Sequence, residues 1–473
     1  MEELDRLDLC VNVDGLPLFK SSGISFWPVL CCVMNLIRWV VFPVALFCGK
    51  GKPDIVGLLE DFVEEAVSLG HQGIMYSGKM LKVVVRCVVC DAPARAMVKG
   101  VALFSGFYGC DQCVQRGQYE RMKGENGGRV TFPKVDCAKR TDLSFRARSH
   151  PDHHRTVSPF CRMPIDMIKC FPVYSMHQVY EGVVRGRALL SVWLRGKRHV
   201  QRRSMSVTQA AEVSRKLSSF RGMIPRVFAR KPRAISDFGV WKGTEFRQFL
   251  LYTSQLALKD MLSQPLYDHF MLLCVGVSIL TSKVLCRRYH GYAHQILVTF
   301  VRRAKYLYGS WFLSYNVHSL THLADAAANF GSLDECSAWK FENFLGKLKR
   351  MVRSGSKPLE QVLRRMHELG TVKPSAAKGQ PCVCVKRPNN AYVLSDTASC
   401  EVLSGPTSVN KYECIVYGVA PLYLWPCTAA MLEHFKAESV GVRKLQRADQ
   451  LVVNAMMIVD GRDRIFLSML HDG

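Results

Sequence analysis

Three acidic side chains have the types and surroundings that metal-dependent phosphodiester chemistry requires. Asp14 follows the apolar run LCVNV, and Asp91 follows the β-branched run KVVVRCVVC. If these runs are neighbouring strands, both carboxylates meet at one sheet edge, where two like charges need a cation between them. Glu342, in WKFENFLGKLKRMV, is our choice for the third carboxylate. Two Mg²⁺ (or Mn²⁺) ions held in this way can drive in-line attack on a phosphodiester.

Each aspartate also has an ordinary structural explanation. An Asp before Gly, such as Asp14, commonly forms a turn, and Asp-Ala-Pro at residues 91–93 can cap a helix. Taken singly, each residue favours the structural role. The strand order and the basic composition together strengthen the catalytic interpretation without deciding between the two roles.

A second kind of chemistry is indicated by YGCDQC (108–113). Cys110 and Cys113 have the spacing of half a tetrahedral zinc site. A rival pair, Cys87 and Cys90, lies in a β-branched strand, where residues three apart face opposite sides of the sheet. We therefore expect the rival pair to be core residues.

The other two zinc ligands have three possible sources in the sequence. One is SHPDHHR with His150, His153 and His154, and another is His177 in YSMHQV. The third is NVHSLTHL, whose histidines at 318 and 322 are spaced i and i+4, so that on a helix they share one face. The residue pattern favours the third source without excluding the other two.

The elements that must position these residues can be followed along the chain. LCVNVDGLPLF (9–19) predicts a strand followed by a turn, and the apolar stretch 26–49 predicts two strands. Residues 54–70 have helical periodicity with a Gly stop, and residues 79–100 predict a strand that leads into a short helix. The expected order is therefore β-β-β-α-β-α. We reject a membrane span over 26–49, because Asn35, Arg38 and two prolines interrupt it.

Beyond residue 100 the composition changes. A polar stretch (115–160) precedes helical segments, helices are expected at 310–330 and 337–355, and residues 370–381 have the composition of a linker. The tail contains four short β-rich runs, AYVLSD, YECIVYGV, QLVVNAMMIVD and DRIFLSML. We predict four regions: 1–105, a mainly helical 106–310, 311–368 with closing helices, and a small β-rich domain at 382–473.

The charge of the chain favours a polyanionic partner. Lys and Arg outnumber Asp and Glu by 64 to 39 in 473 residues, a formal charge of +25. Nucleic acid is the partner that we expect from this excess. The acidic start MEELDRLDL is unlike a signal peptide, so the 19 cysteines are expected to be free thiols or metal ligands in a reducing compartment.

Five stretches carry a family resemblance: VNVDGLPLFKSS, CDAPARAMVKG, SGFYGCDQC, SPFCRMPIDMIKCFPVYSMHQVYEGV and NVHSLTHLADAAANFGSLDECSAWKFENFLGKLKRMV. Over about residues 9–365 the chain resembles the transposases of CACTA-type (En/Spm-like) DNA transposons and their animal relatives. The resemblance implies an RNase H-like α/β core with a mixed sheet, interrupted by a large, mainly helical insertion. It also implies an Asp-Asp-Glu triad formed by Asp14, Asp91 and Glu342.

The same resemblance implies a choice of zinc ligands. In the related core of the V(D)J recombinase and its Transib transposon ancestors, a CxxC after the second Asp joins two histidines that precede the Glu. Here the CxxC begins 19 residues after Asp91, and the second histidine precedes Glu342 by 20. We therefore predict a zinc site formed by Cys110, Cys113, His318 and His322.

The chain departs from the family pattern in two places. Tyr174 stands where relatives often have an acidic residue or Cys, three positions before His177. We therefore give His177 only an auxiliary role. Family members also carry an N-terminal DNA-binding region, whereas this sequence starts 13 residues before Asp14, so we expect a truncated or degenerate copy, or end recognition elsewhere.

Basic residues are concentrated in three stretches of the chain, which we expect to contact DNA. The runs 185–203 and 220–233 are rich in Arg and Lys, and so is the helix that carries Glu342. The predicted DNA contacts are Arg185, Arg187, Arg195, Lys197, Arg198, Lys347, Lys349, Arg350 and Arg353.

Three interpretations follow from these patterns. The first is a nuclear DNA transposase, an enzyme that uses Mg²⁺ (or Mn²⁺) with a structural Zn²⁺, acts on transposon ends and target DNA as a homo-oligomer in a synaptic complex, and does not contact membranes. The second is a transposon-derived nuclear DNA-binding protein that has lost catalysis. The third, a zinc-stapled interaction scaffold without DNA, has only the β-rich tail in its favour.

Overall fold

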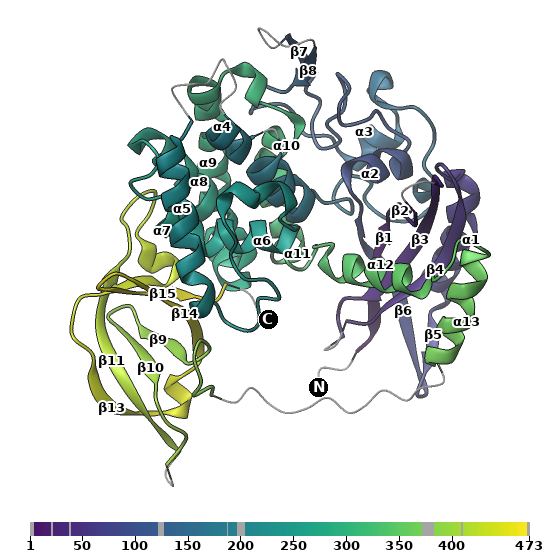
Figure 1. Cartoon of the computed structure of the whole chain (residues 1–473). Coiled ribbons are helices and arrows are strands. Elements are labelled where there is room, and N and C mark those ends of the chain that lie inside the picture. Colours follow the sequence, from purple (N-terminus) through teal and green to yellow (C-terminus); the bar gives the residue numbers. More distant parts are fainter. Residues whose placement is uncertain are drawn as a thin grey trace. The chain divides into compact units, whose positions relative to one another are not determined.

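The computed structural model of this chain describes residues 4–19, 22–36, 39–121, 127–186, 188–195, 204–370, 383–407 and 410–470, with only the backbone at 195 and 370. The chain is a mixed α/β protein that ends in a β-barrel region (Figure 1). The described residues form two compact units: 4–121, 127–176 and 335–370 make the first, and 177–334 and 383–470 make the second. The linker expected at 370–381 lies, except for Gly370, outside the described residues.

The first unit is built on a mixed sheet. Its elements are β1 (Arg6–Val13), β2 (Leu16–Pro17), β3 (Ile24–Val33), β4 (Val41–Lys50), α1 (Ile55–Gln72), β5 (Ile74–Tyr76), β6 (Lys79–Val89), α2 (Ala92–Lys99), β7 (Gln118–Arg121), β8 (Gly128–Thr131), α3 (Asp142–Arg146), α12 (Trp339–Met351) and α13 (Pro358–Gly370). The sheet order is β2-β3-β1-β6-β5, with β4 on the other side of β3. The expected order β-β-β-α-β-α is confirmed, with β2 and β5 as short additions.

The apolar stretch 26–49 is a strand pair, as the sequence predicts. β3 and β4 pair antiparallel from Ile24↔Lys50 to Cys32↔Val41. The turn expected after Asp14 is wrong in detail, because Leu16 and Pro17 pair with β3 as the short strand β2. Gly15 makes this close return possible, since a Cβ there would lie 2.7 Å from the Trp27 ring.

The two faces of the sheet are covered by different helices. Val11 and Val85 pack with Leu59 of α1 and Val98 of α2 in one buried core. Successive strand residues point to opposite faces, so the neighbouring row Cys10, Cys32 and Cys87 faces the other way. That row interacts with Lys340 of α12, which places the helix that carries Glu342 on the second face.

The second unit combines helices with the β-barrel. Its described helices include the π-helical Met176–Arg185, α4 (Leu189–Arg195), α5 (Val207–Ser219), α6 (Gly243–Gln248), α7 (Ser254–Ala257), α8 (Gln264–Thr281), α9 (Lys283–Tyr308), α10 (Tyr315–His318) and α11 (Leu323–Phe330). Its strands are β9 (Ala391–Ser395), β10 (Ala398–Val402), β11 (Lys411–Pro421), β12 (His434–Ala437), β13 (Val442–Arg447), β14 (Val453–Asp460) and β15 (Asp463–Ser468). No helix in the described ranges is long and apolar enough to cross a bilayer.

The barrel closes because β10, the first strand in the sheet order, also pairs with β11. The order β10-β9-β14-β15-β12-β11 is closed by pairing of β10 with β11, and β13 extends the sheet from β11. The four β-rich runs read from the sequence correspond to β9, β11, β14 and β15. The barrel contacts the helices of its unit through hydrogen bonds, for example from the Leu470 N–H to the Tyr252 hydroxyl at 3.1 Å.

Candidate functional site

Parallel strands bring the two aspartates to the same edge of the sheet. β1 and β6 run parallel, and Asn12 lies opposite Val89 at their carboxyl ends. The Asn12 side chain also donates to the Val89 carbonyl at 2.8 Å, which ties the strands together at this edge. Asp14 and Asp91 each lie two residues beyond this pair, so both leave the sheet at this point, as the sequence predicts.

Local hydrogen bonds hold both aspartates. The Gly15 N–H donates to Asp14 Oδ1 at 2.7 Å. Asp91 caps α2, because its Oδ1 accepts from the Ala94 N–H at 2.7 Å. The ordinary capping role of Asp91 is therefore confirmed, and the cap fixes one carboxylate oxygen.

Glu342 joins the two aspartates from α12. It lies in the first turn of that helix and is half-buried. Burial, followed by the negative charges of Asp91 and Glu342, raises the pKa of Asp14 to about 8. The charges of Asp91 and Glu342 thus lie near enough to Asp14 to disfavour its ionised form.

The sequence did not indicate that Tyr174 is a neighbour of this group. Tyr174 is 1 % exposed, and burial together with the charges of Asp14, Asp91 and Glu342 raises its hydroxyl pKa well above the usual value. Tyr174 is therefore a neutral hydroxyl beside the carboxylates. His177 is half-buried in the π-helical Met176–Arg185.

The raised pKa of Asp14 predicts a pH dependence of stability. An unfolded Asp ionises near pH 4, whereas folded Asp14 keeps its proton to about pH 8. Between these values the folded state binds more protons, so this group lowers the free energy of unfolding as the pH rises from about 4 to 8. Asp14→Asn should have the same melting temperature as the parent at pH 4 and a higher melting temperature at pH 8, in buffer without added Mg²⁺ or Mn²⁺. Exposed Asp152→Asn is the control; a pH-independent difference for Asp14→Asn would contradict the argument.

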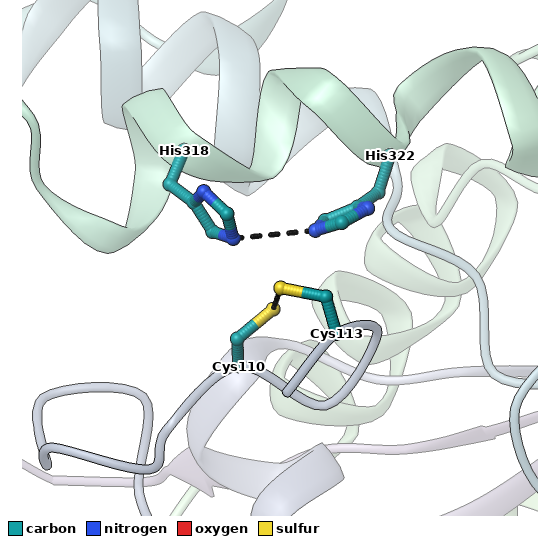
Figure 2. Close-up of side chains that lie close together, drawn as sticks. All are labelled: Cys110, Cys113, His318 and His322. Carbon is teal, nitrogen blue, oxygen red and sulfur yellow. Dashed lines mark hydrogen bonds between the residues drawn. The ribbon is translucent and has the colours of Figure 1, made fainter. Parts of the chain in front are cut away.

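A second group of ligands has the geometry of a tetrahedral zinc site (Figure 2). The ligand atoms of Cys110, Cys113, His318 and His322 all lie within 4.8 Å of one another, and all four residues are buried. The two Sγ atoms are 3.6 Å apart, and the two Nε2 atoms are 3.2 Å apart. Tetrahedral zinc with bonds of about 2.3 Å to sulfur and 2.05 Å to nitrogen requires about 3.8 and 3.3 Å. The four side chains can therefore bind Zn²⁺.

The loop that presents the two cysteines is fixed by backbone contacts. Gly109 passes so close to Leu103 that a Cβ would lie 2.4 Å from its carbonyl oxygen. On the other side, the Arg140 N–H donates to the Gln112 carbonyl at 2.9 Å, and Arg140 Nε donates to the Cys110 carbonyl at 3.2 Å. These contacts hold the short loop that carries both cysteines.

The histidine pair reaches the cysteines from a helix that is not continuous. His318 ends α10, and a 3-10 turn, Ser319–His322, precedes α11. The prediction of one helix over 310–330 is therefore wrong in detail, although the i and i+4 spacing still brings both rings together. Their ring centroids are 5.0 Å apart in an edge-on arrangement.

The other proposed ligands lie elsewhere in the described part of the chain. His153 Nδ1 is 2.7 Å from the Tyr108 carbonyl, and His154 packs edge-on against Phe145. Cys87 and Cys90 are fully buried in or next to β6, as expected for core thiols. In the described ranges, the cluster of two cysteines and two histidines is the one group of three or more such ligands this close together.

Only some of the residues predicted to contact DNA lie in the described part of the chain. Lys347, Lys349, Arg350 and Arg353 are exposed on or just after α12, and Lys349 donates to the Pro17 carbonyl. Arg185 is half-buried and donates to the Gly239 carbonyl at 2.8 Å. Arg187, Lys197, Arg198 and the side chain of Arg195 lie outside the described residues.

No protein-family model matches this sequence, and no curated protein matches it.

Proposed function

We propose that this chain is a DNA transposase with an RNase H-like core, of the CACTA-like group. The observation that carries the proposal is the convergence of Asp14, Asp91 and Glu342 at the carboxyl edge of parallel β1 and β6. The order of an antiparallel β1-β3-β4 meander, α1, a parallel β6 and α2 also supports it, since an RNase H-like core has this order. The excess of basic charge suits a nucleic-acid substrate.

The three carboxylates would hold two Mg²⁺ or Mn²⁺ ions. Their mutual repulsion and the raised pKa of Asp14 fit a site that lacks compensating charge until cations bind. Bound cations would activate water to nick a transposon end and then a 3′-hydroxyl to attack target DNA. The chain itself would orient the site, since the Ala94 N–H fixes one oxygen of Asp91 and the zinc ligands hold the loop that follows α2.

The exposed basic residues of α12 would contact the DNA backbone beside the carboxylates. We expect Lys347→Gln with Arg350→Gln to weaken duplex binding and to reduce the slope of log K against log salt by about 2, roughly one per lost phosphate contact. The measurement is fluorescence anisotropy over a salt series. A matched control, Lys82→Gln with Arg86→Gln, removes the same charge from exposed positions of β6. An equal change in both double variants would contradict this assignment.

Joining of DNA ends tests the transposase function specifically. Purified protein with Mg²⁺ or Mn²⁺ should join a duplex end bearing a free 3′-hydroxyl to a plasmid. The same duplex ending in a 3′-deoxynucleotide should not be joined, because it lacks the attacking oxygen. Plasmid nicking without joining would reduce the proposal to a nuclease.

The alternative function is a nuclear DNA-binding protein without catalysis. Tyr174 favours it, because a buried neutral hydroxyl stands where relatives often have an acidic residue. Salt-dependent DNA binding with neither nicking nor joining would establish this alternative. For both functions we propose the nucleus as the location, and for the transposase a homo-oligomeric synaptic complex.

A further inference from the structure

A buried ion cluster connects the zinc-binding loop to α2. Asp111 lies between the two cysteines of the loop and is 3 % exposed. Its Oδ2 is 3.1 Å from Arg95 Nε and 3.2 Å from Lys99 Nζ. Both cations come from α2, one turn apart, and their side chains are 2 % and 0 % exposed.

The same cations are held on their other sides by the chain around residue 171. Arg95 donates to the Pro172 carbonyl at 2.9 Å. The Lys99 ammonium lies 5.2 Å from the Phe171 ring centroid. Gln112, next to Asp111, donates to the Phe171 carbonyl at 3.2 Å. The loop, α2 and the segment at 171–172 therefore form one buried contact region.

Asp91 caps the beginning of α2, and Lys99 is the last residue of this helix. α2 has eight residues, and Asp91 is its cap. The Arg95 N–H donates to the Asp91 carbonyl at 2.8 Å, and the Ala94 N–H donates to the Asp91 carboxylate. Displacement of the Arg95 side chain would thus move the turn that orients Asp91.

We propose that Asp111 is a positioning residue through which metal binding at Cys110 and Cys113 sets the orientation of Asp91. A metal ion bound by both cysteines fixes the backbone on either side of Asp111. Without it the loop can move, and Arg95 and Lys99 must follow their carboxylate, because cations this deeply buried cannot be left without a counter-charge. The functional meaning of this coupling rests on the proposed role of Asp91 in catalysis.

Amide hydrogen exchange of the full chain tests the coupling without DNA or Mg²⁺. In the parent, removal of zinc with a chelator should accelerate exchange of the Ala94 and Arg95 amides about tenfold relative to amides of α1. In Asp111→Asn, with zinc content checked, chelation should change the same amides less than about twofold, since the link is already broken. Lys99→Met, which removes one of the two links, should give an intermediate response.

Three results would overturn the proposal. They are no change at Ala94 and Arg95 on chelation of the parent, equal acceleration in α1 and α2, and the same tenfold response in Asp111→Asn. The first two need only the parent protein, so a variant that does not fold leaves the test intact. Failure here would leave DNA joining possible, and failure of joining would leave the coupling intact.

Discussion

Cys110→Ser should yield protein without zinc, whereas the parent should contain one zinc per chain. The serine cannot supply the thiolate of the buried four-ligand group, and a structural zinc contributes directly to folding. We expect the melting temperature to fall by about 5–10 °C, which corresponds to about 5–10 kcal/mol if the chain of 473 residues melts as one unit. Metal analysis and thermal melts measure both effects.

The matched control for this variant is Cys87→Ser. Cys87 is also fully buried, but it lies in β6 and belongs to the earlier CxxC pair that geometry excludes. The Cys87→Ser protein should keep its zinc. The hydrogen bond with Cys110 and burial raise the pKa of Cys113, so zinc binding must displace protons and should weaken as the pH falls. A parent protein without zinc would contradict this part of the account.

Replacement of one carboxylate should abolish nicking without loss of the fold. Asp14→Asn, Asp91→Asn and Glu342→Gln should each lower the Mg²⁺-dependent rate about a thousandfold or more, because each ligand is needed to hold the reacting cations. Asn can still cap α2, so Asp91→Asn removes the charge and keeps the helix start. The measurement is the initial rate of plasmid nicking at saturating protein.

Pairs of these substitutions should cost little more than one alone. Residues that act as a unit give non-additive losses, so Asp14→Asn with Glu342→Gln should resemble either single variant. The control, Asp152→Asn, removes an exposed acid and should nick at the parent rate. Losses that multiply would indicate that the carboxylates do not share one site.

The sequence was sufficient for the features that depend on period and spacing. The β-branched runs before Asp14 and Asp91 predicted the strands that become parallel neighbours. The CxxC and the i and i+4 histidines supplied the four ligands that lie together, although the family resemblance was needed to choose this histidine pair among three possible sources. In both cases a few residue types have a geometric requirement that can be recognised along the chain.

Long-range contacts were not predictable in the same way. Asp111 lies between the two cysteines of the CxxC, and nothing near it in sequence shows that Arg95 and Lys99 of α2 are buried against it. The place of Tyr174 beside the carboxylates depends likewise on tertiary packing. Closure of the barrel through β10 and β11 depends on pairing between strands, which alternating apolar residues do not specify.

The most direct test of the central claim is the anomalous scattering of Mn²⁺ in crystals of the full chain bound to a duplex with a free 3′-hydroxyl end. We expect Mn²⁺ peaks bounded by Asp14, Asp91 and Glu342, and a separate Zn²⁺ peak at the cysteine and histidine ligands. Asp91→Asn should lose the Mn²⁺ peaks and keep the Zn²⁺ peak. Bound DNA with no Mn²⁺ between the three carboxylates of the parent would contradict the proposed catalytic site.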